Sequence, residues 1–317
     1  MCFCTIGIDI GGTNLRLALI TMAGDVLVRR KFSSLIAEGR DAFCERLLFG
    51  IEDLRQEAAS RSFDVVGVGV GIPGLVDSDG FIRASVNMRP LDGFNLSSFL
   101  AEKTGLKVES ANDANAIAVG EHLFGAGREF SSFMVITIGT GLGSGLILDG
   151  RLWKGSGGFA SEFGHVTVNP DGHACPCGNH GCLERYVSAD ALQRSIDDSF
   201  PAEADRYRSL TAEELAVMAR EGDHVSREAF RQMGRWLGIA LASISNVLNL
   251  EAIIVGGGVG GSLDLIEPVL REELSKRCFS EIYQDLKIVK GDLGDDAGLF
   301  GAAALVSSTF RHTAKAR

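Results

Sequence analysis

The sequence lacks an excess of positive charge and a long hydrophobic run. Its 317 residues include 31 Lys and Arg against 41 Asp and Glu, and the formal net charge is −10. Nonspecific nucleic-acid binding requires a basic face, so this balance argues against it. Even residues 133–148 are interrupted by glycines and threonine, and they do not form a membrane-spanning helix. We expect neither nucleic acid nor a membrane as a partner.

Signals for export and for disorder are also missing. The chain starts with MCFCTI, which lacks the basic n-region of a signal peptide. Seven cysteines are an odd number, and such a set suits a reducing compartment. There is no low-complexity linker, and hydrophobic residues make up 45% of the chain, which is enough for a substantial core. We therefore expect a folded cytoplasmic protein.

A short loop at residues 165–184 contains a candidate zinc site. It reads HVTVNPDGHACPCGNHGCLE and offers four ligands of the kind that zinc favours, His165, Cys175, Cys177 and Cys182. The alternative is a group of buried thiols beside an unrelated histidine, but a loop rich in Gly, Pro and Asn makes little core. Four protein ligands indicate a structural zinc, which would hold Glu162, His165 and Glu184 as walls of a polar pocket.

A glycine turn near the start of the chain is a candidate phosphate site. Residues 6–16 read IGIDIGGTNLR, in which apolar residues lead into Asp9 and alternate again after the turn. Gly11 and Gly12 let the backbone approach an anion, and Thr13 can donate hydrogen bonds to it. Asp9 would hold Mg²⁺ through water. Glycine turns in hairpins are common, so the motif alone is only moderately specific.

A second copy of this pattern strengthens the interpretation. Residues 136–145 read ITIGTGLGSG, again a strand that enters a Gly/Thr turn and leaves as a strand. In both copies a third strand is expected after a short polar corner. The repeat implies two similar α/β halves that each offer a phosphate-binding hairpin to a shared cleft. Two unrelated hairpins are the alternative, because glycine patterns discriminate loosely.

A third glycine cluster follows a long helix. Apolar residues at helical spacing predict a helix over residues 228–250, and residues 252–261, AIIVGGGVGG, predict a buried strand ending in glycines. Glycines at the carboxyl end of a strand, before a helix that starts near Leu263, leave room for adenine and ribose. A tight strand-to-helix turn with no ligand has the same pattern.

Asp113 is the candidate catalytic residue. Residues 108–116 read VESANDANA and join a short strand to a helix that continues through Glu121. A carboxylate at this helix N-terminus can accept the proton of a substrate hydroxyl while that oxygen attacks a phosphoryl group. Helix capping by Asp113 or Asn112 is the alternative. The three nucleotide-type loops favour the catalytic interpretation.

Taken together, these motifs resemble the ROK family of sugar kinases and repressors. The resemblance rests on DIGGTNLR, ANDANA, SEFGH and CxCGxxGCLE, which occur in the family's order across essentially the whole chain. It implies an α/β, two-domain actin-like ATPase (ribonuclease H-like) fold with the active site in the interdomain cleft. Residues 1–115, completed by a C-terminal helix within 296–317, would form the smaller domain. Residues 116–298 would form the larger one, which carries the zinc loop.

The resemblance also assigns roles to residues. Asp113 matches the catalytic base, and His165 would be both a zinc ligand and a sugar ligand. Sugar hydroxyls would be held by Asn87, Asn112, Asp113, Glu162, His165 and Glu184. ATP and Mg²⁺ would be held by Asp9, Gly11, Gly12, Thr13, Thr140, Gly141, Gly257 and Gly258.

The sequence indicates the type of reaction more specifically than it indicates which sugar is phosphorylated. Sugar hydroxyls both donate and accept hydrogen bonds, so carboxylates, amides and imidazole suit them. The segment LERYVSADAL resembles the glucokinase branch and favours transfer of the γ-phosphate of ATP to O6 of D-glucose. N-acetylmannosamine, N-acetylglucosamine, fructose and allose kinases share the scaffold, and a polyphosphate donor is disfavoured.

The family's repressors add an amino-terminal helix-turn-helix domain, for which we expect no room in this chain. A sugar-binding module without catalysis is a further alternative. A homodimer or homotetramer is expected.

Overall fold

The computed structural model describes residues 2–85 and 88–315. Residue contacts separate the chain into two compact units. The first comprises Met1–Ser131, Gly145–Ser161 and Asp292–Arg317, and the second comprises Ser132–Ser144 and Glu162–Gly291. The bounds of these two units differ from the domain boundary that the sequence predicts near residue 115. The domain boundary stays a prediction.

The first unit is built on a five-stranded sheet with the order β3-β2-β1-β4-β8. β1 pairs antiparallel with β2, β2 pairs antiparallel with β3, and β1, β4 and β8 run parallel. A small sheet, β5-β6-β7, lies in the same unit. The bounds are β1 Cys2–Ile10, β2 Asn14–Thr21, β3 Val26–Ser33, α1 Arg40–Ser60, β4 Phe63–Ile72, β5 Leu75–Val76, β6 Phe81–Ala84, β7 Phe94–Asn95, α2 Leu96–Thr104, β8 Val108–Asn112, α3 Asp113–Phe124 and α9 Ala297–Lys315.

The second sheet has the order β11-β10-β9-β12-β13, which matches the first sheet strand for strand. The internal repeat read from the two glycine turns is therefore confirmed at the level of topology. The third strand of this copy, β11, has only two residues. The bounds are β9 Phe133–Ile138, β10 Leu142–Leu148, β11 Arg151–Leu152, α4 Ala189–Ser199, α5 Ala212–Glu221, α6 His224–Leu248, β12 Ala252–Gly256, α7 Leu263–Arg277, α8 Ser280–Asp285 and β13 Lys287–Lys290.

Several helices expected from the sequence are present, and α5 and α6 begin at side-chain caps. The helix predicted over residues 228–250 is α6, and the helix predicted near Leu263 is α7. Asp223 caps α6 by accepting a hydrogen bond from the Ser226 amide at 2.8 Å. Thr211 and Glu214 form a reciprocal capping box at the start of α5. In the part of the chain that the structure describes, none of the helices combines the length and apolar character needed to span a membrane.

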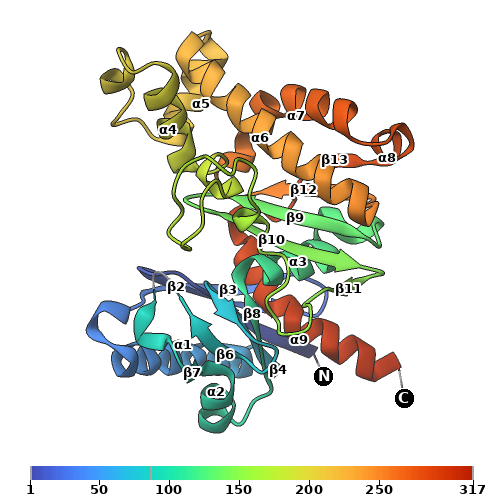
Figure 1. Cartoon of the computed structure of the whole chain (residues 1–317). Coiled ribbons are helices and arrows are strands. Elements are labelled where there is room, and N and C mark those ends of the chain that lie inside the picture. Colours follow the sequence, from blue (N-terminus) through green and yellow to red (C-terminus); the bar gives the residue numbers. More distant parts are fainter. Residues whose placement is uncertain (1, 86–87, 316–317) are drawn as a thin grey trace. The chain divides into compact units, whose positions relative to one another are not determined.

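Glycines let α9 lie directly against the first sheet. A Cβ on Gly7 of β1 or Gly69 of β4 would overlap the backbone carbonyls of Leu299 and Ala302 in α9. The opposite face carries a core that includes Ile8 and residues of α1. The sheet is therefore covered by α1 and α2 on one side and by α3 and α9 on the other (Figure 1). This layering is the α/β arrangement expected from the sequence.

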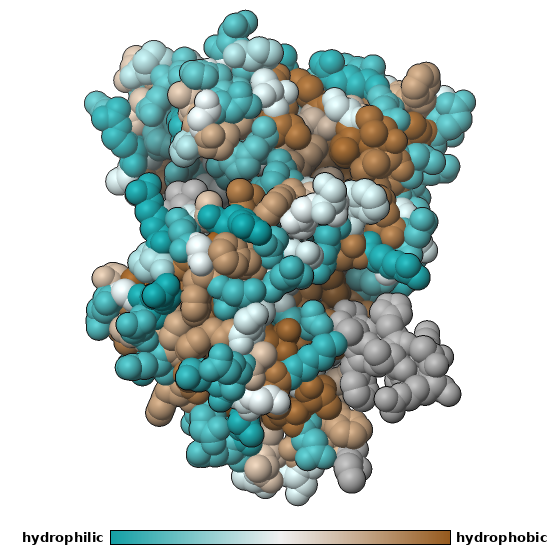
Figure 2. All heavy atoms as spheres, turned by 60° about the horizontal axis from the view of Figure 1, so that its bottom comes forward, coloured by the Kyte–Doolittle hydropathy of each residue, from teal (hydrophilic) through white to brown (hydrophobic). Residues whose placement is uncertain are grey.

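Polar and apolar residues are mixed on the surface. Over the face shown in Figure 2, hydrophilic residues are spread widely with hydrophobic residues among them. Single large apolar side chains are exposed in each unit, for example Phe49 in the first and Phe279 in the second. Isolated exposed apolar residues are normal for a folded protein and need no further explanation.

A buried carboxylate joins α3 to the segment that leads into α9. Glu121 is 2% exposed, and burial raises the pKa of its carboxyl group. The carboxylate accepts hydrogen bonds from the amides of Ala126 at 2.9 Å and of Asp292 and Leu293 at 3.3 Å each. It thereby joins the chain just after α3, at Ala126, to Asp292 and Leu293, which lie far away in the sequence.

We expect Glu121→Ala to lower the stability of the first unit strongly. The change leaves three backbone amides without their acceptor, and each buried unsatisfied group costs about 1–3 kcal/mol. The melting temperature and the hydrogen exchange of α3 would measure the loss. Glu129→Ala, which removes an exposed carboxylate nearby, is the control and should change neither. Equal behaviour of the two variants would contradict the structural role of Glu121.

Candidate functional site

Two predicted carboxylates lie at the same edge of the first sheet. Asp9 pairs with Gly71 across β1 and β4, and Ile72 pairs with Asn112 across β4 and β8. A Cβ added to Gly71 would lie 3.6 Å from the Cα atom of Asp113. The carboxyl ends of the parallel strands thus bring Asp9 and Asp113 together, although they are far apart in the sequence. This edge is where ligands bind in open α/β sheets.

Asn112, not Asp113, is the N-cap of α3. Its Oδ1 accepts hydrogen bonds from the amides of Ala114 at 3.0 Å and Asn115 at 3.2 Å, and its Nδ2 donates to Gly74 O at 3.1 Å. Asp113 follows at the first helical position, where its Oδ1 accepts from the Ala114 amide at 2.9 Å. Capping therefore accounts for Asn112, and the half-buried Asp113 is not required as the cap.

Arg16 is a neighbour of Asp9 to which the sequence prediction gave no role. Its Nε donates to Asp9 Oδ2 at 2.9 Å, its Nη2 pairs with the same oxygen, and its Nη1 donates to Asp295 O at 2.8 Å. Gly298 in α9 leaves space for this carboxylate, since a Cβ there would lie 2.6 Å from Asp9 Cγ. Arg16 therefore orients Asp9 and balances its charge. The antiparallel register that places Arg16 opposite Asp9 was the signal available in the sequence.

The first glycine turn is held by its neighbours on the chain. Gly11 N donates to Asn14 O at 2.8 Å, which closes the turn between β1 and β2. Ser34, after β3, donates its Oγ to Gly12 O at 2.7 Å and its amide to Thr13 O at 2.9 Å. Ser34 is 1% exposed. It is thus a buried support of the turn that the sequence prediction missed.

The second unit brings together the second glycine turn and the third glycine cluster. Residues 139–141 connect β9 to β10, and Gly139 N donates to Gly141 O at 2.9 Å. Gly257 has a φ of 81°, and a Cβ on it would lie 2.5 Å from Ile138 O. Ile138 directly precedes the turn that contains Thr140 and Gly141, so the chain at Gly257 lies against the start of this turn. Two of the predicted nucleotide elements are therefore neighbours within one unit.

The predicted zinc ligands are clustered. One ligand atom from each of His165, Cys175, Cys177 and Cys182 lies within 4.8 Å of all the others. Cys175 Sγ is 3.8 Å from His165 Nδ1, and Cys177 Sγ is 3.6 Å from Cys182 Sγ. Tetrahedral zinc with Zn–S bonds of about 2.3 Å places its sulfur atoms roughly 3.8 Å apart. The donor set and its spacing therefore fit zinc, and four protein ligands fit a structural site.

The backbone of the loop is shaped for this cluster. Cys175 N donates to Asn179 O at 2.8 Å and Gly178 N donates to Cys175 O at 3.0 Å, which forms a tight turn around Cys177. Gly181 has a φ of 66°, and any Cβ there would overlap the carbonyl of Asn169. Glycine is required at this position because a side chain has neither the space nor the backbone conformation.

Glu162 directly precedes one of the two 3₁₀ turns that flank the loop, and Glu184 lies within the other. The turns are η4, Phe163–His165, and η5, Leu183–Arg185. Desolvation raises the pKa of Glu162, the Glu184 carboxylate raises it further, and His165 lowers it. The three groups are thus electrostatic neighbours, which agrees with the expected polar wall. Asn87, the remaining predicted sugar ligand, lies outside the described residues.

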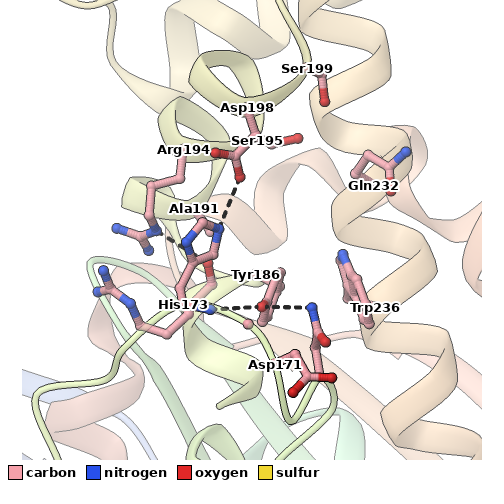
Figure 3. A pocket seen from close by; sticks show the side chains of 13 residues that line it. Asp171, His173, Tyr186, Ala191, Arg194, Ser195, Asp198, Ser199, Gln232 and Trp236 are labelled. Atoms are coloured by element: carbon pink, nitrogen blue, oxygen red, sulfur yellow. Dashed lines mark hydrogen bonds and ion pairs between the residues drawn. The ribbon is translucent and has the colours of Figure 1, made fainter. Parts of the chain in front are cut away.

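A separate cavity of about 560 Å³ lies beside the loop of residues 165–184 that carries the ligand cluster, hereafter the metal loop. It is lined by His173, Tyr186, Asp198 and, from α6, Gln232 and Trp236, and the Tyr186 ring lies between those of His173 and Trp236 (Figure 3). His173 Nε2 is 2.9 Å from Asp198 Oδ2, and the rings of Tyr186 and Trp236 are 4.6 Å apart. Its lining residues are distinct from the predicted sugar and phosphate contacts, so this cavity is not the predicted site.

Comparison with known proteins agrees with the geometry. The family model described as the ROK family matches residues 5–309. A glucokinase of Thermotoga maritima is 32% identical over 95% of this chain and 96% of its own length. The xylose repressor of Caldicellulosiruptor bescii is 32% identical over 96% of this chain and 78% of its own length. A crystal structure of a ROK family glucokinase from Streptomyces griseus, in complex with glucose and AMPPNP, has a TM-score of 0.79 and 33% identity. It covers 95% of this chain and 98% of that chain. The protein belongs to the ROK family and has the family's two-domain, actin-like ATPase fold.

Proposed function

We propose that the protein is an ATP-dependent sugar kinase and that its substrate is a hexose phosphorylated at O6, with D-glucose as the first candidate. The observation that carries the proposal is the placement of Asp113 beside Asp9 at one sheet edge, with the capping role taken by Asn112. Glucokinases among the relatives, and the solved structure of another similar glucokinase with bound glucose, support the choice of glucose.

In this proposal Asp113 accepts the proton of the sugar hydroxyl while that oxygen attacks the γ-phosphorus of ATP. The P–O bond to ADP breaks as the new P–O bond forms, and the proton passes to the carboxylate. Glu162, Glu184 and His165 hold sugar hydroxyls, because carboxylates and imidazole match groups that both donate and accept. Asn112 can add an N–H from its Nδ2, which carries two hydrogens.

The two glycine turns hold the phosphates. Backbone amides of Gly12 and Gly141, with the hydroxyls of Thr13 and Thr140, are suited to donate to phosphate oxygens, and Gly11, which has no side chain, lets the backbone approach them. Mg²⁺ held beside Asp9 would neutralise the negative charge of the phosphates, and zinc would fix the conformation of the metal loop. Gly257 and Gly258 lie at the end of β12, and we assign them to the adenosine.

A sugar-responsive regulator without catalysis is the second candidate, because xylose repressors match this chain at similar identity. Turnover separates the two. The purified protein, with ATP and Mg²⁺, is mixed with glucose, mannose, fructose, xylose, N-acetylglucosamine or N-acetylmannosamine, and ADP release is followed. We expect the highest kcat/KM with glucose. Turnover with another hexose would change the substrate and keep the mechanism, whereas sugar binding without ADP release would favour the regulator.

A further inference from the structure

The turn between β9 and β10, together with the first residues of β10, is bonded to the two ends of the metal loop. This turn, residues 139–141, is the element that we assign to the phosphates of ATP. The loop enters through η4 and leaves through η5 and the start of α4. Each of these segments contacts the turn or the first residues of β10, and all of them belong to the second unit.

The entering segment packs on β10 just after the turn. Phe163 N donates to Ser144 Oγ at 3.3 Å. A Cβ on Gly164 would overlap Leu142 O, so the two backbones touch with no side chain between them. The position of η4 therefore limits where the first residues of β10 can lie.

The leaving segment holds the turn itself. Glu184 Oε2 accepts a hydrogen bond from Leu142 N at 2.9 Å, and the same oxygen fills the space that a Cβ on Gly141 would take. Ala189 N donates to Gly139 O at 2.7 Å. The turn is thus bonded at both of its ends, once by a side chain and once by backbone.

The two segments are also held to each other. Leu183 N donates to Val166 O at 2.9 Å, and Cys182 Sγ lies 3.6 Å from His165 O. His165 belongs to the entering segment and Cys182 directly precedes η5, and both are in the ligand cluster. A metal bound to this cluster would therefore join the two segments that contact the turn and the first residues of β10.

We propose that the metal loop positions the phosphate turn, and that Glu184 is the residue through which it acts. The inference rests on the proposed function, because it takes residues 139–141 as the phosphate site. A carboxylate has two oxygens, so Glu184 can hold the Leu142 amide with one and a sugar hydroxyl with the other. Glu184 is then a positioning residue for the nucleotide as well as a sugar ligand, and it links the two substrates.

A matched pair of variants tests this role in the absence of sugar. Glu162→Ala and Glu184→Ala each remove one carboxylate next to the loop, but only Glu184 is bonded to the turn. Binding of Mg²⁺–AMPPNP to the zinc-loaded proteins is measured by calorimetry. A hydrogen bond to a charged group fixes the turn, so Glu184→Ala should weaken binding about tenfold or more. Glu162→Ala should leave nucleotide affinity unchanged.

The conservative variant Glu184→Gln distinguishes loss of the hydrogen bond to the turn from a general loss of structure. In Glu184→Gln the amide oxygen can still accept from Leu142 N, so nucleotide affinity should return toward that of the parent while sugar affinity stays low. Zinc content is measured for every variant. Equal nucleotide affinity in Glu184→Ala and Glu162→Ala would overturn the positioning role and leave the kinase proposal standing. Failure of the parent protein to bind the nucleotide at all would overturn both.

Discussion

Asp113→Asn is expected to lower kcat by about a hundred- to ten-thousand-fold while leaving the fold unchanged. The amide cannot take the proton of the attacking hydroxyl, so the contribution of general base catalysis is lost. The fold should persist because Asn112, which is unaltered, supplies the cap of α3. Glucose affinity should fall far less than turnover, since an amide can still accept a hydrogen bond.

The measurement is kcat from ADP release, together with glucose affinity from calorimetry and the melting temperature. Asp41→Asn is the matched control, because Asp41 is an exposed aspartate in the first turn of α1 in the same unit. It should retain full turnover. If Asp113→Asn turned over glucose at nearly the parent rate, Asp113 would have no part in the proton transfer.

Cys182→Ala is expected to abolish zinc binding and, with it, most of the sugar affinity. Cys182 is fully buried and lies in the ligand cluster, so its loss leaves three ligands around an incomplete site. Structural zinc contributes about 10–16 kcal/mol of binding free energy in small zinc domains, and that energy orders the chain around the metal. Without it, the segments that carry Glu162, His165 and Glu184 would no longer be fixed.

Metal content per chain, glucose affinity and kcat would be measured for this variant. Cys278→Ala is the control, because Cys278 lies in the same unit, outside the ligand cluster, with its Sγ 3.9 Å from Ala242 O. It should keep zinc and activity. Full glucose turnover by a protein stripped of zinc would contradict the structural role of the metal.

Much of the site could be predicted from the sequence because its parts are local. Each glycine turn follows a buried strand, and the zinc ligands lie within one loop, so short patterns indicate them. The duplicated sheet also follows from a repeat that can be read directly. Asp113 and Asn112 were harder to separate, since both residue types cap helices well and only the hydrogen bonds decide between them.

The contacts that the sequence could not reveal join distant segments. Glu184 and the amide of Leu142 are 42 residues apart, and Gly298 makes space for Asp9 from the opposite end of the chain. Neither contact leaves a periodic signal, because it depends on how strands and helices pack after they form. The contact of Arg16 with Asp9 is partly predictable, because the hairpin register places Arg16 opposite Asp9 once the turn length is known.

The packing of α9 against glycines of β1 and β4 sets an order for folding during synthesis. The five strands of the first sheet, which lie within residues 2–112, are made before the helix that covers one face of it, which begins at Ala297. The second unit ends at Gly291, so all of its residues have been made before α9 begins. Until α9 arrives, the uncovered face of the first sheet would expose apolar surface, and such intermediates are prone to aggregate. We therefore expect the first unit, although it is started first, to be the part of the nascent chain that relies most on chaperones.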